Sequence, residues 1–313
     1  MTAEQARIHM TPKSWGRTDL RPWNGYHDRM TAIGEASFER ADPAARRPDL
    51  SLTLLFTREP PPTQANAAAG FARPISLAHS SCAAWYVLSA TADARIAVGS
   101  TQTLSSSQLR MSVRDGSFAN RVQWQPARTG DSTFMPPGTI HAIGSGLAVV
   151  EIQRKSRTTA RQLDPPPDGA IPAETGRRLR RPTFPHKLTA ERTVLVANPA
   201  FILERMTLAA GVARELDVCV ETWLFVLMGS GRVDSLEVTV GNAILLAADR
   251  ASVLVGTRGL QCLVAYARSV PASYLLRRIN NMRVPDPQPS PPRTVVRLPS
   301  DSTLRSSPGA ARP

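Results

Sequence analysis

One short stretch near the middle of the chain has the residue types and the spacing of a chemical site. Residues 130–144 contain Pro137-Gly138, and His141 follows three residues after the glycine. Proline presets φ and glycine accepts positive φ, so the pair favours a type II turn. In the strand expected after the turn, the apolar neighbours of His141 fall on one face and His141 falls on the other. A histidine that points into a small β domain is either a metal ligand or a buried polar group that needs a partner.

The composition is that of a globular protein. The chain has 313 residues, of which 42% are hydrophobic, and this is enough to bury a sizeable core. It contains no apolar run of membrane-spanning length and no apolar leader segment, so we expect no membrane partner and no secretory signal. The three cysteines are odd in number and have no CxxC spacing. This pattern argues against a disulfide framework or a zinc knuckle and favours a cytoplasmic location.

The formal charge of +13 raises the possibility of nucleic-acid binding. Only three of the basic residues are lysines, and the arginines are scattered along the chain. Their densest cluster is Arg177–Arg181, which lies next to a proline-rich linker rather than on a recognisable element. We therefore expect no nucleic-acid partner, and a salt-sensitive affinity for DNA would contradict this expectation.

The elements that must position His141 are short strands. Residues 1–48 are polar and irregular, and the first clear strand is expected at Leu50 to Phe56. Further strands are expected at 84–89, 94–98 and 130–153, with a helix at 104–114 that covers one end of the block. These elements predict a first antiparallel barrel, with Glu151 in a salt bridge at the end of a strand.

A second strand-rich block follows a Pro/Arg-rich connector. Its expected strands lie between Thr193 and Ala265, and Gly229-Ser230-Gly231 is expected to form a hairpin turn. The fold class is therefore all-β, with two barrels, a few short helices and a disordered C-terminal tail rich in Pro, Ser and Arg. The expected domains are a first barrel at 1–165, a linker at 166–185, a second barrel at 186–271 and a largely disordered tail at 272–313.

Several segments resemble one enzyme family in the correct order. Lys13–Leu20 is similar to a "KPWG" opening, and Ile33-Gly34-Glu35, Ala84–Leu88 and Gly130–Gln153 match later blocks. On these segments the chain resembles the type I phosphomannose isomerases. The resemblance covers roughly residues 11 to 270. It implies two cupin barrels (jelly rolls) and a metal-dependent isomerase that interconverts mannose 6-phosphate and fructose 6-phosphate.

The resemblance also implies a zinc site, but this chain departs from it. The family binds zinc through a Gln-x-His pair, a glutamate and the histidine of the turn motif. These positions fall on Gln64, Asn66, Ala83 and His141, so a histidine and a glutamate are replaced. His79 is a candidate substitute ligand. A neutral set with a single imidazole should bind zinc far more weakly than the usual three ligands.

The remaining family positions concern the sugar phosphate. Arg161 follows a segment similar to the family's "TTYR" and is the candidate catalytic and substrate-binding residue. Glu35 is a second candidate for substrate binding. Two family lysines fall on Thr53 and Ser81.

Three functional hypotheses remain open. The first is a mannose-6-phosphate isomerase-type enzyme with an eroded zinc site and weak or absent activity. The second is a non-catalytic hexose-phosphate-binding or regulatory paralogue on the same double-cupin scaffold. The third is a drifting copy without selected activity, in which His141 is a buried relict.

Overall fold

The structure is a computed structural model, and its described residues form strands with few helical turns. It describes residues 3–25, 28, 30–59, 81–102, 105, 107–108, 111–112, 115, 117–154, 185–247 and 249–279. The expected all-β class is confirmed. The pairings found among these residues leave the sheets open, so two closed barrels stay a prediction.

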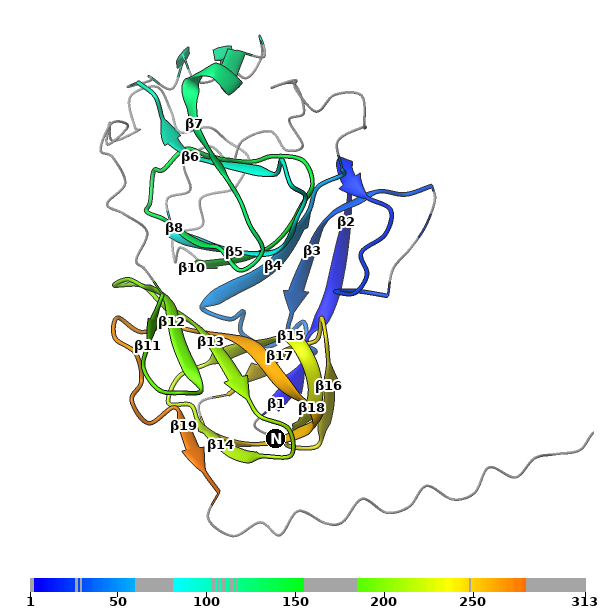
Figure 1. Ribbon diagram of the computed structural model, residues 1–313, viewed down its shortest axis with the longest axis vertical. Coiled ribbons are helices and arrows are strands. Elements are labelled where there is room, and N and C mark those ends of the chain that lie inside the picture. Colours follow the sequence, from blue (N-terminus) through cyan, green and yellow to red (C-terminus); the bar gives the residue numbers. More distant parts are fainter. Residues whose placement is uncertain are drawn as a thin grey trace, which may run out of the picture. The chain divides into compact units, whose positions relative to one another are not determined.

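The first lobe is built on a six-stranded antiparallel sheet with the order β2-β3-β4-β10-β5-β8 (Figure 1). Its strands are β2 (Arg7–Arg17), β3 (Ile33–Glu39), β4 (Leu50–Phe56), β5 (Ala83–Ala90), β8 (Ser132–Met135) and β10 (Leu147–Arg154). The sheet brings together strands from the first half of the chain and from the turn motif. It therefore supplies most of the wall that faces His141.

A three-stranded sheet with the order β7-β6-β9 faces this wall. Its strands are β6 (Arg95–Ser100), β7 (Val122–Pro126) and β9 (His141–Ile143). Side chains of both sheets, among them Val87, Val149, Ile96 and Ile143, form one buried cluster between them. The outer face of the small sheet is covered by η2 (Ser117–Arg121) through Phe118.

Part of the expected helix at 104–114 lies outside the described residues. Helical turns are found at 107–108 and 111–112.

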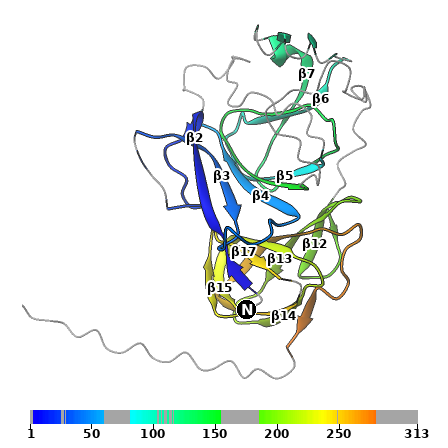
Figure 2. The same cartoon turned by 180° about the vertical axis from the view of Figure 1, so that it is seen from behind.

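The second lobe is a ten-stranded sheet around its own apolar cluster. Its strands are β1 (Ala3–Gln5), β11 (His186–Lys187), β12 (Arg192–Ala197), β13 (Ile202–Leu208), β14 (Ala213–Asp217), β15 (Thr222–Val233), β16 (Leu236–Thr239), β17 (Ala243–Leu246), β18 (Arg250–Tyr266) and β19 (Leu276–Arg278). The chain enters this lobe twice, because β1 at the N-terminus pairs with β17 (Figure 2).

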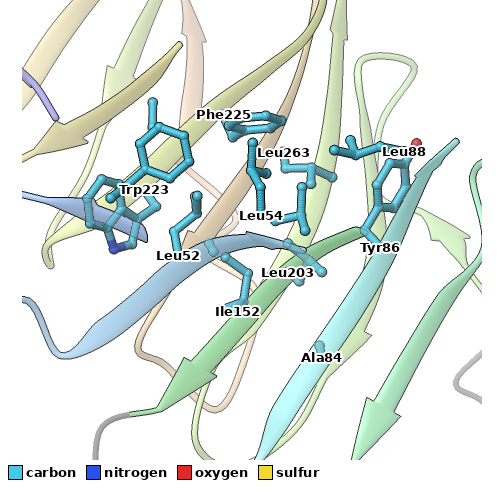
Figure 3. Packing of buried hydrophobic residues seen from close by; sticks show 14 of the residues in the cluster. Leu52, Leu54, Ala84, Tyr86, Leu88, Ile152, Leu203, Trp223, Phe225 and Leu263 are labelled. Atoms are coloured by element: carbon cyan, nitrogen blue, oxygen red, sulfur yellow. The ribbon is translucent and has the colours of Figure 1, made fainter. Parts of the chain in front are cut away.

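The six-stranded sheet is covered on both faces. Along β4, Leu52 and Leu54 point to one side and pack with Leu203, Phe225 and other residues of the second lobe (Figure 3). The alternate residues of the same strands point to the other side, into the first lobe. One strand therefore contributes to two cores, and its sequence shows an apolar face and a more polar face.

Two expectations from the sequence are wrong. Residues 1–48 are not irregular, because β1, β2 and β3 lie there. Their polar residues occupy edge and half-buried positions. Gly229-Ser230-Gly231 is not a hairpin turn, since β15 runs through it, with one shift in the register to β18 between Gly229 and Gly231. The chain reverses later, where Asp234 has a positive φ of 51°.

Candidate metal and substrate site

His141 lies where the turn motif predicts. Gly138 has a φ of 78°, and the Thr139 N–H donates to the Pro136 carbonyl at 3.1 Å, which closes the tight turn. In β9, Ala142 packs on the outer face and His141 points to the interior, where it is 2% exposed. The inward histidine is confirmed.

The backbone fixes the tautomer of the His141 ring. Nδ1 of His141 lies 2.9 Å from the Thr139 carbonyl oxygen. A carbonyl oxygen only accepts hydrogen bonds, so Nδ1 must carry the proton and Nε2 must carry the lone pair in the neutral ring. Nε2 is therefore the atom of His141 that is able to coordinate a metal or accept a hydrogen bond from a ligand.

Trp85 joins His141 to a buried carboxylate. The ring centroids of Trp85 and His141 are 5.2 Å apart at an interplanar angle of 84°, which is an edge-to-face contact. The Trp85 indole N–H donates to Glu151 Oε1 at 2.9 Å, and Glu151 is 8% exposed. Within the described residues this bond replaces the salt bridge expected for Glu151. No local sequence pattern predicts this bond, because Trp85 and Glu151 become neighbours only through the register of β5 and β10.

Ala83, the residue on which the resemblance places the family's glutamate, lies on the same wall. It lies two residues before Trp85 on β5 and belongs to the interior cluster of the first lobe, with 1% exposure. Its neighbour across the strands is Gln153, whose Nε2 donates to the Ser81 hydroxyl at 2.9 Å. This part of the wall therefore carries the methyl group of Ala83 and the neutral polar side chains of Gln153 and Ser81.

A polar row crosses the same face of the sheet. Cross-strand pairing places Ser37 opposite Thr53, Thr53 opposite Glu151, and Glu151 opposite Trp85. Paired residues of an antiparallel sheet share a face, so these side chains all point into the first lobe. Thr53, one of the two positions where the family has lysine, contributes a hydroxyl here.

Glu35 also lies on β3 but is held in an ion pair. Its Oε1 is 3.9 Å from Nζ of Lys13, and the side chain of Glu35 is 22% exposed. Its cross-strand partner on β4 is Leu55, which belongs to the interior cluster. Glu35 therefore lies at the rim of the same wall.

Three of the predicted site residues lie outside the described residues, namely Gln64, Asn66 and Arg161, as does His79. Whether Gln64 shares a cavity with His141, and whether Arg161 reaches it, stays a prediction.

The described donors do not fit a zinc ion by themselves. A catalytic zinc takes three protein ligands from His, Cys, Asp and Glu. In the part of the chain that the structure describes, no three such residues come together. His141 supplies one nitrogen, and one oxygen of Glu151 already accepts the Trp85 indole.

Comparisons with known proteins agree with this architecture. The crystal structure of the mannose 6-phosphate isomerase from Bacillus subtilis superposes with a TM-score of 0.60 and 16% identity, covering 85% of this chain and all of that one. The apo form of the Salmonella typhimurium enzyme gives 0.56 and 10% identity, covering 86% of this chain and 100% of that one. Likenesses this low in identity show the fold.

The comparison of sequences finds relatives that match a shorter stretch of the chain. A mannose-6-phosphate isomerase of Streptococcus mutans is 38% identical over 80 residues, which is 26% of this chain and 25% of that protein. Over this segment the chain is similar in sequence to mannose-6-phosphate isomerases. No family model matches it. The match spans a quarter of its curated relative, so activity and substrate do not follow from it.

The chain has the inward histidine of the turn motif, and Ala83 and Asn66 stand at two positions where the resemblance leads us to expect ligands. Within its described residues no helix is both long and apolar enough to cross a bilayer.

Proposed function

We propose that the chain is a mannose-6-phosphate isomerase-type protein whose zinc site is eroded and whose isomerase activity is weak or absent. The observation that carries the proposal is that His141 is buried in the first lobe against Trp85, while the residue two positions before Trp85, at the expected glutamate position, is the buried Ala83. The scaffold keeps the histidine of the family, while the carboxylate position is filled by a methyl group.

The chemistry explains why this loss matters. An aldose–ketose isomerisation moves a proton between adjacent carbons and develops negative charge on the sugar oxygens. Preorganised donors, cations or a metal must stabilise that charge. The described wall offers Glu151 and hydroxyl groups, and it has Thr53 and Ser81 at the two lysine positions. Arg161 is the proposed residue that holds the phosphate and supports the reaction.

A second candidate is a non-catalytic hexose-phosphate-binding or regulatory paralogue. It is favoured by the polar inner face, which offers hydrogen-bond partners to a sugar without requiring a metal. Three free cysteines support a cytoplasmic location for either candidate.

The test is coupled conversion of mannose 6-phosphate to fructose 6-phosphate by the full chain, with and without added zinc. We expect a rate at or near background in both cases, and thermal stabilisation by hexose phosphates if the second candidate holds. The His141→Ala variant is the control for a rate due to a contaminating isomerase. A zinc-dependent rate that this variant abolishes would show a working isomerase.

A further inference from the structure

One cluster of side chains in the second lobe brings together a nucleophile, a cation and a phenol, and we call it the thiol cluster. Cys219 lies in the turn between β14 and β15, and its side chain is exposed. Arg268 and Tyr274 lie in the segment between β18 and β19. The cluster joins two segments that carry none of the candidate site residues.

Two donors converge on the Cys219 sulfur. Nη1 of Arg268 donates to Sγ at 2.7 Å, and the Tyr274 hydroxyl donates to Sγ at 3.5 Å. The same Nη1 lies 2.9 Å from the Tyr274 hydroxyl oxygen, so the three groups hold one another in place. A neutral thiol is a weak acceptor, and a charged acceptor makes the stronger bond. The arrangement therefore favours the thiolate, which is the nucleophilic form of cysteine.

The other two cysteines provide a contrast within the same chain. Cys82 and Cys262 are buried, and burial raises the pKa of each thiol. Buried structural thiols of this kind are inert toward reagents in solution. Of the three cysteines, Cys219 is the one that combines exposure with a guanidinium bond to its sulfur.

Arg268 also indicates the charge of the reagent. Within the described residues, the guanidinium of Arg268 bonds the Cys219 sulfur and the Tyr274 hydroxyl through Nη1, and it is in ion-pair contact with no carboxylate. Its Nε and Nη2 can therefore donate to a carboxylate of an incoming molecule, a geometry that suits the guanidinium fork. A cation beside an exposed nucleophile attracts anionic reagents and repels cationic ones.

We propose that Cys219 is a thiol–disulfide exchange site for a small disulfide that carries carboxylates, for which glutathione disulfide is the probe. The Cys219 sulfur attacks one sulfur of that disulfide, a new S–S bond to Cys219 forms, and the old S–S bond breaks. The leaving thiolate takes up the proton that Cys219 releases, so the reaction needs no further oxidant. Arg268 stabilises the attacking thiolate and binds a carboxylate of the reagent. The inference is independent of the proposed isomerase function.

The experiment measures mixed-disulfide formation on the full chain by mass spectrometry at neutral pH, with glutathione disulfide and with the cationic disulfide cystamine. We expect a single adduct, at Cys219, that is absent from Cys219→Ser. Arg268→Gln should lower the rate with glutathione disulfide, relative to the rate with cystamine, by about fivefold or more, the effect of one unit charge at close range in water. Arg268→Lys keeps the charge and should keep most of this preference.

Arg258→Gln, at an exposed position earlier on β18, is the matched control and should leave both rates unchanged. The unchanged protein gives a test that does not depend on the folding of a variant. In it, Cys219 should react faster with glutathione disulfide in the folded chain than in the urea-unfolded chain. An equal rate in the two states, an adduct on Cys82 or Cys262 of the folded chain, or an unchanged rate ratio in a folded Arg268→Gln variant would overturn the inference.

Discussion

At the scale of single residues, the site depends on how Trp85 connects its neighbours. Its ring contacts His141 edge-to-face, and its indole N–H satisfies one oxygen of the buried Glu151. The sequence predicted His141 because a Pro-Gly turn and strict alternation fix its direction locally. It did not predict Glu151 as the partner of Trp85, because the pair depends on a strand register set over 66 residues of separation.

Replacing Trp85 by Phe should destabilise the protein. The ring packing is largely kept, but Glu151 loses its donor and a buried carboxylate is left less satisfied, at a cost of about 2–3 kcal/mol. Urea unfolding of the variant measures this free energy. In the Glu151→Gln background the same substitution should cost clearly less. Equal costs in both backgrounds would mean that the indole bond contributes nothing.

At the scale of elements, glycines mark two different features that look alike in the sequence. Gly241 has a φ of 86° in the turn between β16 and β17, as its Gly-Asn context predicts. Gly229 has a similar φ of 81° but sits inside β15, where a Cβ would lie 1.9 Å from the Gly259 carbonyl oxygen. The close approach of another strand cannot be read from local sequence, and this is why the expected hairpin turn was wrong.

Gly229→Ala should therefore cost more than a positive φ alone explains. Gly211→Ala is the matched control, because Gly211 has a φ of 70° and no atom within 4 Å of its Cβ position. We expect about 1 kcal/mol for Gly211→Ala and at least 3 kcal/mol for Gly229→Ala in chemical denaturation. Similar losses at the two positions would contradict the clash.

In the second lobe, β12, β13 and β18 share a buried ionic network. Arg192 binds Glu204 through two hydrogen bonds of 2.8 Å, and Tyr266 donates to the same carboxylate. Burial, followed by the charge of Glu204, raises the pKa of Tyr266 above its ordinary value near 10. The hydroxyl of Tyr266 also accepts the N–H of Ala272, which holds the segment before β19.

This shift predicts a loss of stability at alkaline pH. The unfolded Tyr266 ionises above about pH 10 while the folded one stays neutral, so the unfolding free energy falls from there by up to about 1.4 kcal/mol per pH unit. Tyr266→Phe should remove this part of the slope and keep the part due to buried Cys262, whose pKa is also raised by desolvation. An unchanged slope in the Phe variant would show that Tyr266 titrates normally.

At the scale of the whole molecule, the described strands of both lobes share a core. Phe225 of β15 contacts the ring of Phe38 on β3 with centroids 5.9 Å apart, and the indole of Trp223 donates to the Leu50 carbonyl at 3.0 Å. Alternation within Leu50–Phe56 predicts a strand with two unlike faces. Which elements cover each face depends on contacts between residues far apart in the sequence, so local patterns do not predict it. The pairing of the N-terminal β1 with β17 of the second lobe is likewise a long-range contact.

Because the core is shared, unfolding should be cooperative across both lobes. Phe225→Ala should cost about 3–5 kcal/mol, and tryptophan fluorescence and far-UV circular dichroism should give coincident transitions before and after the change. Met228→Ala, on the same strand but 63% exposed, should cost less than about 0.5 kcal/mol. Two separated transitions in the unchanged protein would mean that the lobes unfold independently.

The central claim is that the chain has an inward His141 and an alanine, Ala83, where the resemblance leads us to expect a carboxylate ligand. Zinc content per chain, measured by mass spectrometry on the purified protein and on the Asn66→His/Ala83→Glu double variant, tests it most directly. We predict well below one zinc per unchanged chain and close to one per chain in the variant. One tightly held zinc in the unchanged protein, or no gain in the variant, would contradict the account.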